Sequence, residues 1–450
     1  MARLFGTDGI RGIANEDLTC ELVYKLGQAS AHILNRSEGN STKILIGRDT
    51  RISGDMLEAA LVAGICSMGA DAIVVGVLPT PAIAHLVRAY RCDAGIVISA
   101  SHNSMEYNGI KVFDKEGYKL SDELEDEIED LINGGTYDIE LPTGDRVGTK
   151  TYWHNGGRDY IDHIKGIVDA NFVGLRVALD CANGASYSVA PTIFEELGAK
   201  VSVIHANSNG IDINANCGSV YPEKLKQFVI DTKSDIGFAF DGDADRLISV
   251  DEMGNIIDGD QIMAVCAAEL IEQGKLKRNT VVSTVMSNMG FDIAMKEAGC
   301  NVVKTQVGDR YVLERMLKDG YNFGGEQSGH IIFLDHNTTG DGTLTAVKLM
   351  EIMKRRGKQI SELANIMKRF PQILVNVKAD EEAKKSYRDD KDIESAIKNV
   401  EAKLGGRGRV LIRPSGTEPL IRIMIEGEDQ KIIEAYANDL AKLFRQKFKP

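Results

Sequence analysis

Paired cysteines are absent from this chain, although it is long enough to hold several domains. Its seven cysteines lie singly along 450 residues, with no C-x-x-C pair among them. An odd and scattered set of this kind is typical of reduced thiols in the cytosol. We therefore expect neither disulfides nor a zinc site.

Long apolar runs and blocks of positive charge are also lacking. The most apolar window, 59–70, is bounded by Glu58 and Asp71 and is too short to cross a bilayer, and the N-terminus lacks the apolar core of a signal peptide. Asp and Glu outnumber Lys and Arg by 66 to 53, which gives a formal charge of −13. We predict a soluble, cytoplasmic protein that binds neither nucleic acid nor membranes.

One pattern recurs three times along the chain. A short apolar strand is followed by a polar or glycine-containing break, an amphipathic helix, a Gly-small pair and another apolar strand; the copies span 43–75, 176–204 and 281–303. Short helices that close in glycine before a second strand are typical of right-handed βαβ crossovers. The sequence therefore predicts an α/β fold with three successive α/β domains and mixed sheets.

The last part of the chain has a different rhythm. A charged helical stretch from Asp380 to about Leu404 lies between apolar strands, and a final helix runs to Phe448, which predicts a smaller C-terminal α+β domain. The segments 142–148 and 149–157 are predicted as linker. We expect ligands to bind in a central cleft between the domains. The predicted domains span 1–150, 151–255, 256–370 and 371–450.

The apolar strand at 95–98 ends abruptly in small polar residues. Ser101 stands there beside His102 and Asn103, and Lys111 follows beyond a turn at Gly109. These neighbours suit a nucleophilic or phosphate-carrying serine. An ordinary Ser/Asn turn between two strands explains this segment equally well when it is taken alone.

Three acidic residues, Asp241, Asp243 and Asp245, follow the apolar run 236–240. In an extended segment they would project to one side, and converging carboxylates need a cation, for which Mg²⁺ suits hard oxygen ligands best. An EF-hand calcium loop is the main alternative and a plain acidic turn the other. Arg246 opposes the EF-hand because it stands where that loop demands glycine, and strands rather than helices flank the segment.

Three further loops carry polar groups that suit a phosphorylated sugar. Arg413 and Arg422 flank small residues in what is either an anion nest or a plain hairpin loop. Glu326 and His330 lie in a loop that could bracket sugar hydroxyls, although a lone histidine is more often structural. Arg11 stands between glycines, either against a phosphate or at the surface. The glycine spacings of nucleotide-binding loops are absent, so no nucleotide cofactor is supported.

Taken together, these segments resemble the α-D-phosphohexomutases over the whole chain. The opening Phe-Gly-Thr-Asp-Gly-Ile-Arg-Gly and the later Gly-Glu-Gln-Ser-Gly-His are similar to the branch that acts on glucosamine phosphates. The resemblance implies an isomerase that interconverts glucosamine 6-phosphate and glucosamine 1-phosphate for cell-wall precursor synthesis. It also implies a phosphoserine, one Mg²⁺ per subunit, and glucosamine 1,6-bisphosphate as intermediate and activator.

The resemblance assigns a role to each motif. Ser101 would carry the phosphoryl group and bind Mg²⁺ together with Asp241, Asp243 and Asp245. The groups implied around the reacting phosphate are Arg11, His102, Lys111 and Arg246. The groups implied around the sugar are Glu326, Ser328 and His330. The groups implied around the non-reacting phosphate are Arg413, Ser415, Gly416, Thr417 and Arg422.

Some features are left open by the sequence. The general base is His102, Lys111 or His330. The fourth domain is expected to swing over the cleft, and a homodimer is one option for the assembly.

The family's serine loop commonly has proline and aspartate where this chain has Ser104 and Tyr107. Losing the proline would loosen the loop, yet we predict an active enzyme. The alternatives are a glucose- or mannose-phosphate mutase of the same family and a non-catalytic regulator that binds metal and sugar phosphate.

Overall fold

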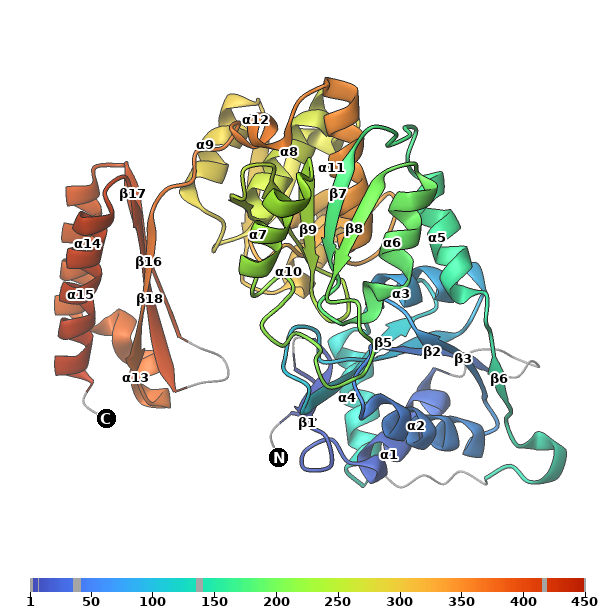
Figure 1. Ribbon diagram of the computed structural model, residues 1–450. Coiled ribbons are helices and arrows are strands. Elements are labelled where there is room, and N and C mark those ends of the chain that lie inside the picture. Colours follow the sequence, from blue (N-terminus) through green and yellow to red (C-terminus); the bar gives the residue numbers. More distant parts are fainter. Residues whose placement is uncertain (1–2, 7, 35–41, 135–140, 415–418, 449–450) are drawn as a thin grey trace. The chain divides into compact units, whose positions relative to one another are not determined.

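The computed structural model describes residues 3–6, 8–34, 42–134, 141–414 and 419–448, which form four sheets of six, five, four and three strands (Figure 1). The chain divides into two compact units. One unit comprises Met1–Met286 with Gly299–Ile366, and the other comprises Ser287–Ala298 with Met367–Pro450. Within the described residues, no helix combines the length and the apolar character needed to span a bilayer.

The first sheet has the order β1-β5-β4-β2-β3-β6 and is mixed, as predicted. β2, β3, β4 and β6 run parallel, whereas β5 pairs antiparallel with β4 and β1 pairs antiparallel with β5. Apolar side chains of α1 and α2 meet those of the strands in one buried core. The elements are β1 Ile10–Ile13, α1 Cys20–Ile33, β2 Lys43–Arg48, α2 Gly54–Ser67, β3 Asp71–Val77, α3 Thr80–Ala89, β4 Ala94–Ile98, β5 Tyr107–Asp114, α4 Asp122–Ile132 and β6 Lys150–Tyr152.

The linker prediction for 149–157 is wrong, because part of that segment is structured. β6 pairs with the edge strand β3 in parallel, and the Trp153 amide donates to the Val74 carbonyl at 2.8 Å. An exposed strand edge gains hydrogen bonds from any short segment that can extend along it. The helix α5, Gly156–Gly166, begins before the predicted linker ends.

The second and third sheets carry the other two predicted crossovers, and both are parallel pairs. β7 pairs with β8 and β12 pairs with β13, in the orders β11-β10-β9-β7-β8 and β13-β12-β14-β15. The domain boundaries predicted near residues 150 and 255 lie close to β6 and β11. These boundaries remain a prediction. The second sheet and its helices are β7 Arg176–Asp180, α6 Val189–Glu196, β8 Lys200–Ile204, α7 Glu223–Thr232, β9 Ile236–Phe240, β10 Leu247–Asp251 and β11 Ile256–Ile257. The third sheet and its helices are α8 Gly259–Glu272, β12 Thr280–Thr284, α9 Met289–Glu297, β13 Asn301–Thr305, α10 Asp309–Asp319, β14 Phe323–Gly325, β15 Ile331–Phe333, α11 Gly342–Arg356 and α12 Ile360–Ala364.

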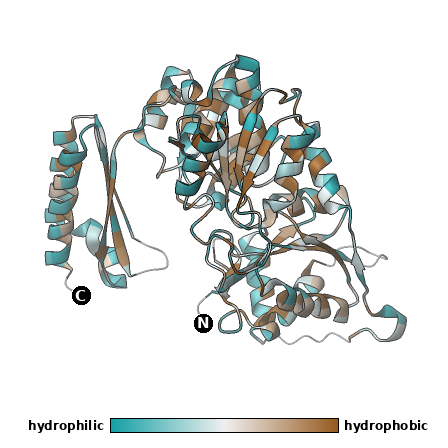
Figure 2. Cartoon of the chain, viewed as in Figure 1, coloured by the Kyte–Doolittle hydropathy of each residue, from teal (hydrophilic) through white to brown (hydrophobic). Residues whose placement is uncertain are grey.

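The second unit contains an antiparallel sheet of order β16-β18-β17. Strands β16 and β18 are largely apolar, whereas α14 and α15 show hydrophilic faces (Figure 2). Apolar side chains of these strands and helices form one core. The elements are β16 Gln372–Lys378, α13 Glu381–Ser386, α14 Lys391–Leu404, β17 Gly408–Pro414, β18 Leu420–Gly427 and α15 Gln430–Lys447.

The charged stretch from Asp380 to Leu404 is two helices rather than one. Asp380 accepts a hydrogen bond from the Ala383 amide at 2.8 Å and caps α13. Asp390 accepts from the Asp392 amide at 2.9 Å and caps α14. A side chain that satisfies the free amides of a first turn favours a new helix start, so the chain restarts at Asp390.

Candidate active site

Ser101 lies just beyond the end of β4, as predicted, but its side chain is buried. The residue is 1% exposed and has a left-handed φ of 51°. Its Oγ donates to Asp241 Oδ2 at 2.6 Å and lies 3.4 Å from His102 Nδ1. The hydroxyl thus faces the acidic loop of the second sheet rather than solvent.

The main chain around Ser101 is held by side chains that the sequence did not single out. The fully buried Arg51 donates through Nη2 to the carbonyls of Ser101 at 3.0 Å and Asn103 at 2.8 Å, and through Nη1 to that of Tyr107 at 2.9 Å. Asn214 Nδ2 donates to the same carbonyls of Ser101 and Asn103, at 2.8 and 2.9 Å. These hydrogen bonds to main-chain carbonyls hold the serine loop in place, although it has Ser104 where the family commonly has proline.

The three aspartates lie in the hairpin that joins β9 to β10. Their carboxylate oxygens lie within 4.8 Å of one another, and all three side chains are buried. The segment is a turn with Ala244 at φ 56°, so the expected extended alternation is wrong although the convergence is confirmed. Antiparallel strands on both sides rule out the helix-flanked EF-hand.

A buried lysine contacts two of these three carboxylates. Lys111 Nζ lies 2.9 Å from Asp243 Oδ2, 3.2 Å from Asp245 Oδ2 and 3.1 Å from Asp8 Oδ2. Burial by itself would lower the pKa of Lys111, but the surrounding carboxylates raise it well above its ordinary value. Lys111 is therefore a cation in this arrangement.

The acidic loop keeps acceptor capacity for a second cation. Burial and the neighbouring carboxylates raise the pKa of Asp241 well above its ordinary value. Among the described residues, the buried Oδ1 atoms of Asp243 and Asp245 have no hydrogen-bond partner. Buried acceptors without donors are costly, and a metal ion would satisfy them. The residues present thus fit a bound divalent cation.

The groups predicted around the reacting phosphate lie near the acidic loop, one of whose aspartates accepts the hydrogen bond from Ser101. Arg246 donates its backbone N–H to Asp241 Oδ1 at 3.2 Å, and its pKa is raised by neighbouring carboxylates against the opposing effect of burial. Arg11 is paired with Asp8. Burial first, and then Arg246 and Arg11, lower the pKa of His102 to about 4, so its ring is neutral near pH 7.

The predicted sugar loop joins β14 to β15 and reaches the acidic loop. Arg246 and His330 form an isolated antiparallel bridge. His330 Nε2 accepts from the Gly340 amide at 3.0 Å, and Nδ1 lies 3.7 Å from Asp245 Oδ2. Glu326 is buried and accepts from the Gly308 amide at 3.1 Å, whereas Ser328 is exposed.

The sequence reasoning missed a charged network beside this site. Lys119 forms ion pairs with both Asp8 and Asp309, and so joins the loop after β5 to the start of α10. Asp8 lies inside the opening glycine motif and could have been found there. No local pattern marks Lys119 or Asp309, because their partners lie far away in the chain.

The predicted phosphate nest lies in the second unit. Arg413 and Arg422 are register partners in the β17–β18 pair, so they flank the connecting loop from both strands. Ser415, Gly416 and Thr417 lie outside the described residues.

Comparison with known proteins identifies the class to which this fold and site belong. Family models for phosphoglucomutase/phosphomannomutase match all four regions: domain I at 2–138, domain II at 158–254, domain III at 258–370 and the C-terminal domain at 374–443. The chain belongs to this family, the phosphohexomutases.

Its curated relatives narrow the class further. The chain is 57% identical to a phosphoglucosamine mutase of Thermoanaerobacter sp. strain X514, over 99% of this chain and 100% of the relative. It is 58% identical to that of Clostridium botulinum strain Hall, over the full length of both chains.

Solved structures agree with the fold. A phosphoglucomutase/phosphomannomutase family protein from Burkholderia thailandensis superposes with a TM-score of 0.81 at 24% identity, covering 100% of this chain and 98% of the other. N-acetylphosphoglucosamine mutase from Aspergillus fumigatus, solved with GlcNAc-6P and magnesium, gives 0.72 at 17% identity, covering 99% and 96%.

Proposed function

We propose that this chain is a Mg²⁺-dependent phosphoglucosamine mutase, which interconverts glucosamine 6-phosphate and glucosamine 1-phosphate in cell-wall precursor synthesis. The observation that carries the proposal is the 2.6 Å hydrogen bond from Ser101 Oγ to Asp241, inside an acidic cluster with unsatisfied buried oxygens. Full-length identity of 56–58% to phosphoglucosamine mutases supports the choice of substrate.

In the proposed reaction, phosphorylated Ser101 transfers its phosphoryl group to O1 of glucosamine 6-phosphate. The bond from phosphorus to Oγ breaks as the bond to O1 forms, and the hydroxyl proton of O1 passes to a base. The resulting glucosamine 1,6-bisphosphate turns over in the site, and its O6 phosphate returns to Ser101. Such transfers depend chiefly on in-line positioning and on positive charge around the transferring oxygens.

The chain's own residues would supply that charge and position. Lys111 and Arg246 contact the acidic loop, and together with Arg11 they would face the phosphoryl oxygens. Mg²⁺ held by Asp241, Asp243, Asp245 and Ser101 would add charge there when bound. The loop with Glu326, Ser328 and His330 would orient the sugar, and the loop flanked by Arg413 and Arg422 would hold the second phosphate.

The proton acceptor is proposed among three groups. His102 is neutral near pH 7 and its Nδ1 lies 3.4 Å from Ser101 Oγ. Lys111 and His330 are the other candidates, and both contact the acidic loop. Lys111 would act as a base only after losing its proton, because the surrounding carboxylates raise its pKa. Loss of turnover in His102→Gln, but not in His330→Gln, would assign the role to His102.

Intact mass and peptide mapping of the purified protein test the mechanism class. We expect one phosphate on Ser101 that passes to the substrate and is replaced by the substrate's phosphate in each turnover. Ser101→Ala should lose nearly all activity, whereas the matched control Ser104→Ala, in the same loop and exposed, should keep it. Phosphorylated, Mg²⁺-loaded protein without turnover would favour a non-catalytic regulator.

Substrate comparison tests the choice within the family. We expect glucosamine 6-phosphate to give the highest kcat/KM, above glucose 6-phosphate and mannose 6-phosphate. A preference for either hexose phosphate would assign the chain to the glucose or mannose branch. We also propose a cytoplasmic location, which the seven free cysteines support. Sedimentation checks whether the protein forms a homodimer, which is one option for its assembly.

A further inference from the structure

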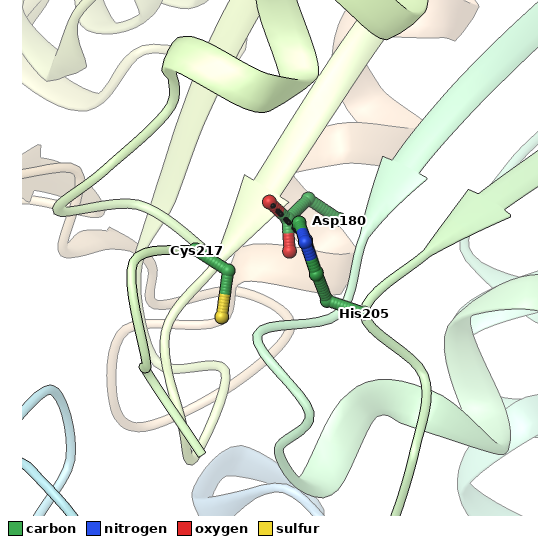
Figure 3. Close-up of side chains that lie close together, drawn as sticks. All are labelled: Asp180, His205 and Cys217. Carbon is green, nitrogen blue, oxygen red and sulfur yellow. Dashed lines mark ion pairs between the residues drawn. The ribbon is translucent and has the colours of Figure 1, made fainter. Parts of the chain in front are cut away.

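A second cluster of metal-ligating side chains lies in the second sheet, apart from the acidic loop. Asp180 ends β7, His205 follows β8, and Cys217 lies in the loop before α7 (Figure 3). Because β7 and β8 are parallel, their carboxyl ends meet at one edge of the sheet. One nitrogen, one oxygen and one sulfur ligand are thereby brought within 4.8 Å of one another.

Asp180 and His205 form an ion pair (Figure 3) whose geometry is not that of a hydrogen bond. His205 Nδ1 lies 3.0 Å from Asp180 Oδ2. Nevertheless, this buried nitrogen has no hydrogen-bond partner of acceptable angle among the described residues. Tetrahedral zinc with bonds of about 2.0–2.2 Å to nitrogen and oxygen separates those two atoms by roughly 3.3 Å. The observed pair is close to that spacing.

The surrounding main chain fixes two of the three ligands. Asp180 accepts from the Ala182 amide at 2.9 Å through Oδ1 and from the Gly218 amide at 3.0 Å through Oδ2, which orients the carboxylate and leaves lone pairs free. His205 has a left-handed φ of 48°. Such a conformation is costly for a residue other than glycine and is often kept at functional positions.

Cys217 supplies the ligand that selects the metal. Its thiol is 1% exposed, and burial, followed by the charge of Asp180, raises its pKa to about 12. Metal binding would break the S–H bond, form a bond from sulfur to the metal and release one proton to solvent. Thiolate and imidazole favour zinc and its neighbours, whereas the all-oxygen acidic loop favours magnesium.

We propose that Asp180, His205 and Cys217 bind a divalent late transition-metal ion, Zn²⁺ by preference, with water in the fourth position. The ligands come singly from three loops, which is why the absence of cysteine pairs does not reveal the site. The side chain of His205 is 20% exposed, so a metal ion would reach the site from solvent at this residue.

The site would act on structure rather than on the reacting atoms. His205 and Cys217 bound the loop that carries Asn214, whose Nδ2 donates to the Ser101 and Asn103 carbonyls at 2.8 and 2.9 Å. A metal bound to both ends would fasten that loop. The proposal concerns binding, so it stands or fails independently of the mutase reaction.

Cobalt substitution of the full-length protein tests the site. With excess Mg²⁺ to fill the acidic loop, Co²⁺ should produce a thiolate-to-cobalt charge-transfer band in the near ultraviolet, and Zn²⁺ should abolish it at one equivalent. Cys217→Ala should lack the band. Cys181→Ala removes another buried thiol, directly after β7, and should keep the band. Absence of the band in the unaltered protein, or its persistence in Cys217→Ala, would overturn the proposal.

Thermal denaturation distinguishes a variant that has lost the metal site from a variant that misfolds. His205→Asn removes the ring with a residue that tolerates a left-handed φ. Zn²⁺ should raise the melting temperature of the unaltered protein and of Cys181→Ala, but not of His205→Asn. An equal rise in all three would contradict the proposal, because the ion would then bind elsewhere.

Discussion

The guanidinium of Arg51 donates to the carbonyl of Ser101 at 3.0 Å, although both residues are almost completely buried. The same side chain forms a salt bridge to Asp49 at 2.9 Å. One planar group therefore connects the main chain at Ser101 to the end of β2. We propose Arg51 as a positioning residue, because it would act on the proposed reacting serine through the loop.

Replacing Arg51 with lysine should lower kcat far more than it raises KM. Lysine keeps the charge opposite Asp49 but has no planar fork to hold several carbonyls at once. A misplacement of about 1 Å can cost about 100-fold in rate, and we expect a loss of that order. Steady-state kinetics and circular dichroism check this. A purely structural role would instead lower the melting temperature and leave the kcat of the folded fraction unchanged.

Restoring proline in the serine loop should stabilise the protein without loss of activity. Ser104 is exposed, so a pyrrolidine ring at this position would point into solvent. A proline that fits the native backbone typically adds about 0.4–1 kcal/mol by restricting the unfolded chain. Differential scanning calorimetry of Ser104→Pro checks the gain. A lower melting temperature would mean that the loop differs from the family's proline-containing form.

Mg²⁺ should raise the melting temperature through the acidic loop. A ligand at 100 times its Kd stabilises the folded state by about 2.7 kcal/mol. Asp241→Asn should lose most of this shift, because it removes one ligand charge. Asp439→Asn, an exposed position on α15, is the matched control and should keep it. Equal shifts in both variants would place the Mg²⁺ effect elsewhere.

Two stacked histidines should make the fold sensitive to acid. The rings of His85 and His163 lie 3.7 Å apart. Burial first, then neighbouring charges that include Arg88, lower the pKa of His85 to about 3 and that of His163 to about 4. Below their ordinary pKa of 6.5, the unfolded chain binds protons that the folded chain does not, so stability falls as the pH drops.

His163→Gln removes one of these groups and should flatten the fall in melting temperature between pH 6.5 and about 4. The comparison is made against the unaltered protein at each pH, because carboxylates also titrate there. The same dependence on pH in both proteins would show that the pair does not contribute.

The sequence predicts this molecule well where the signal is local. Apolar strands followed by glycine-closed helices identify the βαβ units, and short motifs find Ser101 and the three aspartates. Long-range contacts could not be predicted in this way, because Arg51 and Asn214 contact the serine loop only in the folded chain. The strand β6 was missed for the same reason, since its pairing depends on the free edge of β3.

Lys111 gives the acidic loop an internal counterion. Without it, carboxylates gathered this closely would repel one another until a metal arrived, and folding would depend on the metal supply. With Nζ 2.9 Å from Asp243, we expect the chain to fold before the proposed Mg²⁺ binds. Chelation of the metal should accordingly stop turnover while leaving the fold intact. Added Mg²⁺ should restore turnover of the same sample.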